Sequence, residues 1–168
     1  MQQTWAALTR AKVVSDSNPS VSAAPGRYKI ANALMLKAAW LCCVLGGIYY
    51  GLPAIAAMFV LSFWQRELAK DRPFVIALGL IGLCLDTFWM YAGVLDYGDA
   101  ALNLAPSLNI APAWIVMLWL AVGLSIRHSL IFLVNRPVLG ALLVGGGAPL
   151  SYLTGESFGA VAIPSVQG

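Results

Sequence analysis

Residues 74–95, FVIALGLIGLCLDTFWMYAGVL, form an unbroken apolar stretch that contains one carboxylate, Asp86, near its middle. At a rise of about 1.5 Å per residue, a helix of this length extends about 33 Å, enough to cross the hydrocarbon core of a bilayer. An ionised side chain at that depth is costly unless it is paired, hydrated or neutral. The stretch therefore predicts a transmembrane helix whose carboxylate needs partners.

The remainder of the chain has the same character. Of its 168 residues, 60% are hydrophobic and 10% are charged, and the mean hydropathy is +0.80. Soluble domains carry about a quarter charged residues. The composition predicts an all-helical polytopic membrane bundle of about five transmembrane helices, preceded by a mobile cytoplasmic tail over residues 1–28. Within the single transmembrane domain, 29–168, the predicted spans are about 30–50, 54–68, 74–95, 112–134 and 138–153.

The basic residues predict the orientation. They precede the first span, separate spans two and three, and separate spans four and five, whereas the connections 51–53 and 96–110 contain none. By the positive-inside rule, the amino terminus is cytoplasmic and five spans place the carboxyl terminus outside. The net charge of +3 is scattered between apolar spans. Because the basic residues build no patch, the charge pattern argues against a nucleic-acid partner, and the lipid bilayer is the expected partner.

The face of the third span that carries Asp86 is rich in glycine. At 100° per residue, Gly79, Gly82, Met90 and Gly93 lie within about 40° of Asp86 around the helix. Glycines on a membrane helix mark the face that a neighbouring helix approaches closely. We therefore expect Asp86 to point into the bundle.

Span four supplies candidate partners for this carboxylate. Arg127, His128 and Ser129 lie in its second half, about 10 Å from its end. An arginine or histidine at this depth could pair with Asp86, so these four residues are predicted to form an intramembrane polar group. The same residues also fit a proton relay, because carboxyl and imidazole groups exchange protons, with Glu156 extending it outward. The residues favour structural pairing slightly over the relay.

The fifth span contains a feature that predicts a broken helix. Gly145, Gly146 and Gly147 precede Pro149, which removes one amide donor and clashes with the carbonyl of Gly145. Backbone N–H and C=O groups that lose their helical partners at membrane depth must form hydrogen bonds with protein or water, as they do in the broken helices of transporters. Tyr152 and Glu156, four residues apart, share a helical face, which fits an interfacial anchor or a head-group contact.

Several chemistries are disfavoured by the residues present. The single histidine, His128, excludes a multi-histidine metal centre. Ser129 points about 100° away from His128 on a helix, which disfavours a nucleophile and base pair. Cys42, Cys43 and Cys84 fall inside predicted spans, have no metal-ligand spacing and are read as small packing residues. No cofactor or metal is predicted.

Four segments carry a further signal: AWLCCVLGG (39–47) with Asn32, LCLDTFWMYAG (83–93), PAWIVMLWLAVGLSIRHSL (112–130) and GAPLSYLTGESFGAVAIP (147–164). Together they resemble a bacterial family of small inner-membrane proteins of unknown function. The resemblance implies a location in the bacterial inner membrane and no known activity. It also implies a further apolar helix after residue 168. The residues it singles out are Asn32, Trp40, Asp86, Trp114, Trp119, His128, Ser129, Pro149, Tyr152 and Gly155.

Three classes of function remain open. The residues favour a structural or accessory membrane subunit, which would work as a homo-oligomer or with a membrane partner protein. The alternative is a small transport or proton-linked protein that uses Asp86 and His128. A lipid-modifying membrane enzyme ranks third, because neither a nucleophile beside a base nor a histidine cluster is visible.

Overall fold

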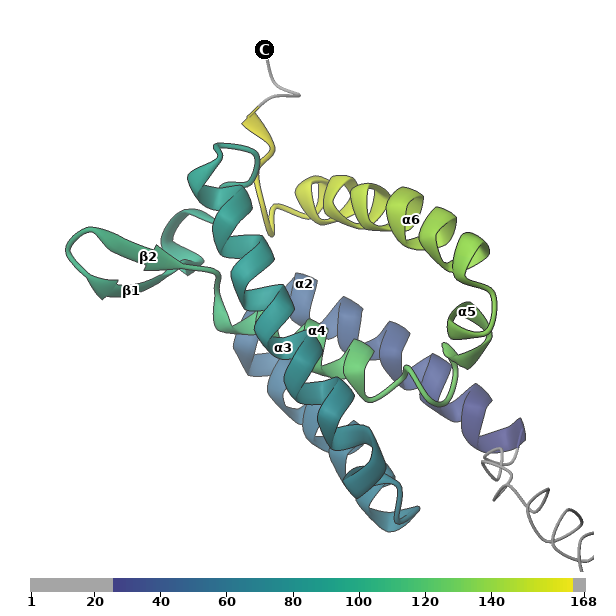
Figure 1. Ribbon diagram of the computed structural model, residues 1–168. Coiled ribbons are helices and arrows are strands. Elements are labelled where there is room, and N and C mark those ends of the chain that lie inside the picture. Colours follow the sequence, from purple (N-terminus) through teal and green to yellow (C-terminus); the bar gives the residue numbers. More distant parts are fainter. Residues whose placement is uncertain (1–25, 165–168) are drawn as a thin grey trace, which may run out of the picture.

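The computed structural model describes residues 26–164, and Figure 1 shows its elements. Residues 1–25 of the predicted tail lie outside this range, whereas Gly26 already begins the first helix. The helices are α2 (Gly26–Trp64), α3 (Leu68–Tyr91), η1 (Gly98–Ala100), α4 (Ala113–Gly123), α5 (Ile131–Val134) and α6 (Pro137–Ser157), and the strands are β1 (Leu102–Ala105) and β2 (Leu108–Ile110).

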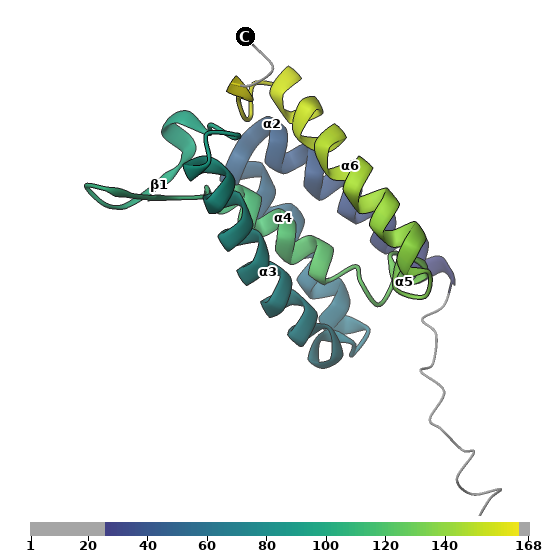
Figure 2. The same ribbon diagram turned by 45° about the horizontal axis from the view of Figure 1, so that its top comes forward.

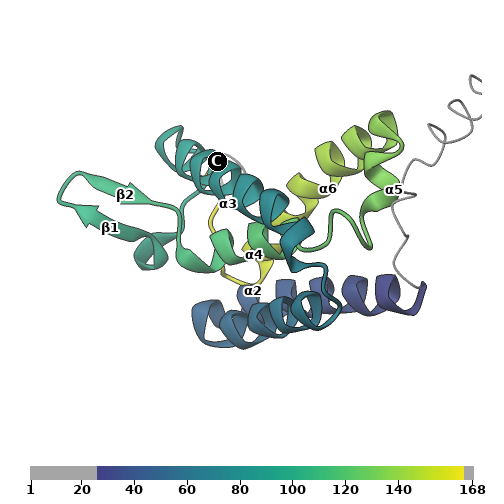
Figure 3. The same ribbon diagram turned by 60° about the horizontal axis from the view of Figure 1, so that its bottom comes forward.

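Helix α2 contains the first two predicted spans as a hairpin. The chain turns at Gly47, where φ is 55° and ψ is −136°, a conformation that glycine adopts without steric cost. Figures 1 and 3 show the two arms, 26–46 and 48–64, side by side. The turn predicted at 51–53 is therefore wrong, because those residues belong to the second arm. Gly51 instead allows the arms to approach, since a Cβ there would lie 2.5 Å from Cys43 Sγ.

Helices α3 and α4 pack through glycines, as the third span predicts. A Cβ on Gly79 would lie 2.7 Å from Leu120 Cδ2, and one on Gly82 would overlap the Trp119 ring. From α4, Gly123 approaches the backbone of α3 at Val75. The glycine face of α3 is thus the face that α4 covers, and Asp86, which lies on it, is completely buried.

Replacing Gly123 with alanine is expected to cost about 1–3 kcal/mol of stability. The new Cβ would lie 2.6 Å from Val75 Cα, and a helix backbone cannot move aside as a side-chain tip can. Gly145→Ala is the matched control, because nothing lies within 4 Å of a Cβ there and alanine favours a helix by about 0.5–1 kcal/mol over glycine. Unfolding in detergent micelles measures both; equal effects would contradict the close approach.

The fourth predicted span is not a continuous helix. Helix α4 ends at Gly123, turns occupy 124–130, and α5 spans only Ile131–Val134. Buried Ser125 donates its hydroxyl to the carbonyl of Ala121, and the carbonyl of Leu124 accepts from Asn32 Nδ2 at 3.2 Å. These contacts satisfy backbone that leaves the helix, which is the condition for irregular structure inside an apolar bundle.

The break predicted in the fifth span is wrong. Helix α6 continues through Gly145, Gly146, Gly147 and Pro149, and none of these glycines has positive φ. Proline removes one backbone hydrogen bond, whereas unwinding the run would free several, which costs more in apolar surroundings. Figure 2 shows α6 running along the outside of the bundle from α5 to the last described residues.

The predicted loop 96–110 contains a small hairpin that projects from one end of the bundle (Figures 1 and 3). Leu102 pairs with Ile110 and Asn103 with Asn109 in antiparallel register. The segment after α6 returns to this end, where the backbone of Ala162 pairs with Asp96. Its side chains join a buried apolar cluster that includes Leu95, Tyr97, Ala111, Trp114, Val161 and Ile163.

The architecture is a helical bundle, as the composition predicts. Three helices, α2, α3 and α6, are long and apolar enough to cross a membrane. Helix α4 has 11 residues and extends about 16 Å, too short to cross alone. The described chain is therefore that of a membrane protein whose irregular central segment, 124–130, is enclosed by longer helices.

Candidate functional site

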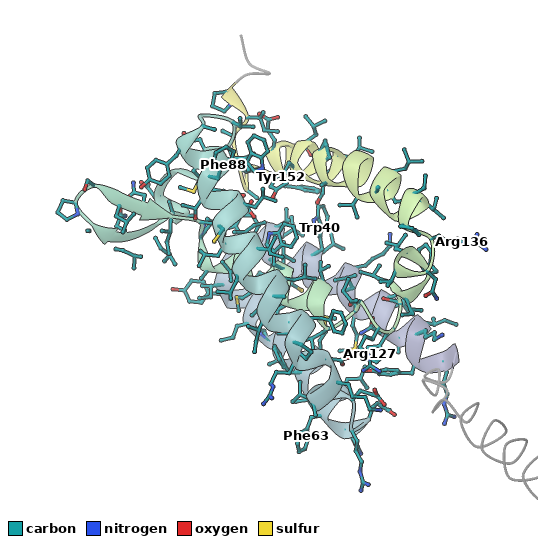
Figure 4. The ribbon with its side chains drawn as sticks, viewed as in Figure 1. Trp40, Phe63, Phe88, Arg127, Arg136 and Tyr152 are labelled. Atoms are coloured by element: carbon teal, nitrogen blue, oxygen red, sulfur yellow. The ribbon has the colours of Figure 1, made fainter. Side chains whose placement is uncertain are left out.

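Two buried polar clusters lie in the bundle, one around each of two aspartates of α3. The Asp86 cluster comprises Asp86, Tyr97, Trp119 and Tyr152. The Asp71 cluster comprises Tyr28, Ser62, Glu67, Asp71, Arg127 and His128. Figure 4 shows Tyr152 toward one end of the molecule and Arg127 toward the other. Asp71 and Asp86 are separated by about 22 Å along the helix.

Three neutral donors from three different segments surround Asp86. Tyr97 and Tyr152 donate their hydroxyls to Oδ1 at 2.7 and 2.6 Å, and Trp119 Nε1 donates to Oδ2 at 2.7 Å. Tyr97 follows α3, Trp119 lies on α4 and Tyr152 on α6. One carboxylate therefore joins α3, α4, α6 and the loop between α3 and η1, and no cation contacts it among residues 26–164.

The Tyr97 hydroxyl is held as a donor. Burial raises its pKa above the ordinary tyrosine value, and the neighbouring charge of Asp86 raises it further. The ring also contacts buried Trp114 edge to face, with centroids 5.7 Å apart. Trp114, one of the residues that the resemblance singles out, is thus a core residue that is 8% exposed.

A second hydrogen bond fixes α6 beside the Asp86 cluster. Trp40 Nε1 on α2 donates to Ser151 Oγ at 2.9 Å, one residue before Tyr152. Figure 4 shows Trp40 and Tyr152 between α6 and the rest of the bundle. The prediction that Tyr152 and Glu156 act as an interfacial anchor is wrong for Tyr152. Glu156 accepts a hydrogen bond from the amide of Ile163 at 3.0 Å.

The predicted pairing of Asp86 with Arg127 or His128 is wrong, because both residues pair with Asp71. His128 Nε2 lies 2.9 Å from Asp71 Oδ2, and Arg127 Nη1 donates to Asp71 Oδ1 at 3.2 Å. Ser62 Oγ donates to Asp71 Oδ2 at 2.7 Å. Asp71 is completely buried and His128 is 1% exposed. The carboxylate thus accepts from three side chains that come from two other segments.

Glu67 connects this cluster to the surface. It accepts from Arg127 at 3.1 Å and from exposed Lys70 at 3.0 Å. Partial burial raises the pKa of Glu67, but the hydrogen bonds and positive charges of Lys70 and Arg127 outweigh it, so the net pKa is below the ordinary value. Arg127 therefore bridges two carboxylates, one buried and one at the surface.

His128 also presents an unpartnered atom. Since Nε2 faces a carboxylate, it carries a proton, and the second nitrogen, Nδ1, is buried without a hydrogen-bond partner among the described residues. The same holds for the hydroxyl of Tyr28, whose ring meets the His128 imidazole edge-on at a centroid distance of 4.7 Å. Ser129, which the sequence places in the same polar group as His128, donates instead to Asn32 Oδ1 at 2.7 Å.

Tight apolar packing separates the two clusters. Between Asp71 and Asp86 on α3 lie Val75, Gly79 and Gly82, which pack against Gly123, Leu120 and Trp119 of α4. The four predicted residues Asp86, Arg127, His128 and Ser129 therefore do not form one polar group, and the glycine run 145–147 contacts neither cluster, since nothing lies within 4 Å of a Cβ on any of its residues.

Comparison with known proteins gives one assignment. The family model "Protein of unknown function (DUF2878)" matches residues 29–167, so the chain belongs to this family. No curated protein and no solved structure matches the chain. The resemblance noted in the four sequence segments is thereby confirmed at the level of the family.

Proposed function

We propose that this member of the DUF2878 family is a structural or accessory subunit of a membrane assembly. The observation that carries the proposal is the state of Asp86: each oxygen of its carboxylate accepts from a neutral donor of a neighbouring segment, and its side chain is fully buried. A carboxylate held this way joins segments together. It has no exposed surface on which to receive a substrate or ion.

Helix α6 supports an accessory role. Only 6% of its most apolar 18-residue stretch is buried, and its glycine run, 145–147, has no neighbour within 4 Å of a Cβ position. Glycines on membrane helices are enriched where another helix approaches. We propose that a helix of the partner protein packs along this run.

The proposed location is a bacterial inner membrane with the amino terminus in the cytoplasm. The contact of Tyr28 with His128 and the ion pair of Glu67 with Arg127 bring the start of α2, the α2–α3 turn and segment 124–130 to one end. This end carries the basic residues, whereas 92–112 and 154–164 at the opposite end contain neither lysine nor arginine. Such asymmetry favours a cytoplasmic location for the basic end.

Gly146→Leu is expected to remove the partner and leave the chain folded. The leucine would occupy open space in the chain itself but would block a closely packed helix. Chemical cross-linking in native membranes followed by purification measures partner recovery, and thermal unfolding measures the fold. Ala141→Leu enlarges an exposed residue about 140° away around α6 and is the control. Equal partner recovery from all three chains, or no cross-linked partner at all, would contradict the proposal.

A proton-linked role is the second candidate, and one observation favours it. The buried nitrogen Nδ1 of His128 and the Tyr28 hydroxyl have no hydrogen-bond partners among the described residues, so two buried polar atoms that could take part in a proton path lie at the basic end. The Asp86 cluster lies about 22 Å away along α3, and the packed residues between α3 and α4 separate it from His128. Asp86 therefore takes no part in this proton-linked role. Proton flux into liposomes that disappears with His128→Gln would favour this candidate.

A further inference from the structure

A groove of about 680 Å³ lies at the turn between α2 and α3, and it belongs to neither polar cluster. Its lining residues are Phe63, Trp64, Arg66, Leu68, Ala69 and Arg72. Its walls therefore combine four apolar side chains with two arginines and contain no acidic residue. This composition matches a molecule with an anionic group and an apolar portion.

The two arginines are available to such a molecule. The nearby carboxylates, Glu67 and Asp71, are engaged by Lys70, Arg127 and His128. Within residues 26–164, Arg66 and Arg72 form no salt bridge. Arginine presents a planar fork of donors that suits phosphate oxygens.

Arg66 occupies a position that normally favours glycine. Its φ is 58°, its amide donates to the carbonyl of Phe63 at 2.9 Å, and the next amide, of Glu67, donates to the carbonyl of Ser62 at 3.0 Å. This is the hydrogen-bond pattern that ends many helices with glycine in the left-handed conformation. Arginine is strained in this conformation, whereas glycine is not.

The aromatic residues place the groove at the level of lipid head groups. Phe63 is 71% exposed and Trp64 is 81% exposed, and Figure 4 shows Phe63 at the far end of the bundle from Tyr152. Both residues lie at the end of the second arm of the α2 hairpin, 48–64. Tryptophan at such a helix end typically lies at the membrane–water interface.

We propose that this groove binds an anionic phospholipid, with the phosphate between Arg66 and Arg72 and an acyl chain along Phe63, Trp64 and Leu68. Charge complementarity selects an anionic head group, because two arginines that form no salt bridge within residues 26–164 line the groove. The apolar side chains of the groove favour a lipid over free phosphate, because an acyl chain would cover them whereas phosphate would leave them exposed to water.

Quenching of Trp64 fluorescence by brominated lipid tests the proposal. The chain is reconstituted in phosphatidylcholine vesicles that contain either brominated phosphatidylglycerol or brominated phosphatidylcholine, and Trp64→Phe identifies the signal of this tryptophan. Phosphatidylglycerol is expected to quench Trp64 preferentially. Arg66→Gly and Arg72→Gln should each lower this preference about fivefold, the effect of one basic residue at a membrane surface.

The variant Arg66→Gly separates lipid binding from folding. Because glycine adopts positive φ readily, this variant is expected to unfold at the same temperature as the original chain or higher, while its lipid preference falls. Arg136→Gln removes an exposed arginine outside the groove and should leave the preference unchanged. Equal quenching by both lipids, an unchanged preference in the double variant of Arg66 and Arg72, or loss of the preference on adding inorganic phosphate would overturn the proposal.

Discussion

Replacing Asp86 with alanine is expected to lower the free energy of unfolding by about 3–5 kcal/mol, one of the largest effects of any single change in this chain. The substitution leaves the Tyr97 and Tyr152 hydroxyls and the Trp119 indole N–H without their acceptor. Each buried donor left unsatisfied costs about 1–3 kcal/mol, and partial relaxation reduces the sum. Denaturant titration in detergent micelles measures the change.

Two further variants make the Asp86 experiment specific. Asp86→Asn keeps the shape and one acceptor oxygen, so its cost is expected to be about 1–2 kcal/mol. Asp99→Ala removes an exposed carboxylate from η1 and should change stability by less than about 0.5 kcal/mol. If Asp86→Ala proved as harmless as Asp99→Ala, the carboxylate would not be a structural link.

Replacing Asp71 with alanine is expected to cost a similar amount, about 3–5 kcal/mol, for a different reason. The variant removes the buried carboxylate that pairs with the Arg127 guanidinium. It also leaves His128 and Ser62 without their hydrogen-bond acceptor. Breaking one side of a buried ion pair costs more than replacing both sides. Asp71→Ala with His128→Ala should therefore cost less than the sum of the single changes.

Glu67→Ala provides the comparison for Asp71. Glu67 binds the same arginine, but its side chain is 21% exposed, so water can replace part of the interaction and the expected cost is about 1 kcal/mol. The three variants and the double variant are compared by unfolding in the same detergent. Additive costs at Asp71 and His128 would show that the two residues are not coupled.

The sequence predicts those features of the fold that depend on local patterns. Apolar length predicts the helices that could cross a membrane. The glycine spacing around Asp86 predicts that a neighbouring helix covers this face of α3, and the structure identifies that helix as α4. The burial of Asp86 follows from the same pattern and is confirmed. These predictions succeed because helical periodicity fixes which side chains share a face.

The partners of Asp86 could not be predicted in this way. Tyr97 and Tyr152 are 11 and 66 positions away in the chain, and only the path of the loop and of α6 brings them to the carboxylate. The sequence predicts Arg127 or His128 as the partner of Asp86, because it matches opposite charges only by their depth in the membrane. The predicted spans 54–68 and 74–95 leave Asp71 in the connection between them, whereas α3 begins at Leu68 and buries it.

The positions at which helices are interrupted also could not be predicted from glycine and proline in the local sequence. Glycine and proline predicted a break in α6, which is continuous, whereas the actual interruption follows Gly123. At that point the deciding interaction is distant, because Asn32 on α2 donates to the carbonyl of Leu124. Inside an apolar bundle, a helix can end where other segments form hydrogen bonds with its unpaired backbone groups. A single sequence does not reveal which segments supply those bonds.

Cross-linking between positions 40 and 151 tests most directly whether Asp86 holds α6 in the bundle. The native cysteines, Cys42, Cys43 and Cys84, are replaced by alanine, and Trp40→Cys and Ser151→Cys are joined by a short bismaleimide in native membranes. These two substitutions also remove the Trp40–Ser151 hydrogen bond, so that Asp86 remains the principal polar link to this part of α6. We expect efficient cross-linking with Asp86 present and a several-fold decrease with Asp86→Ala. Equal cross-linking in both chains would show that α6 is positioned without the carboxylate.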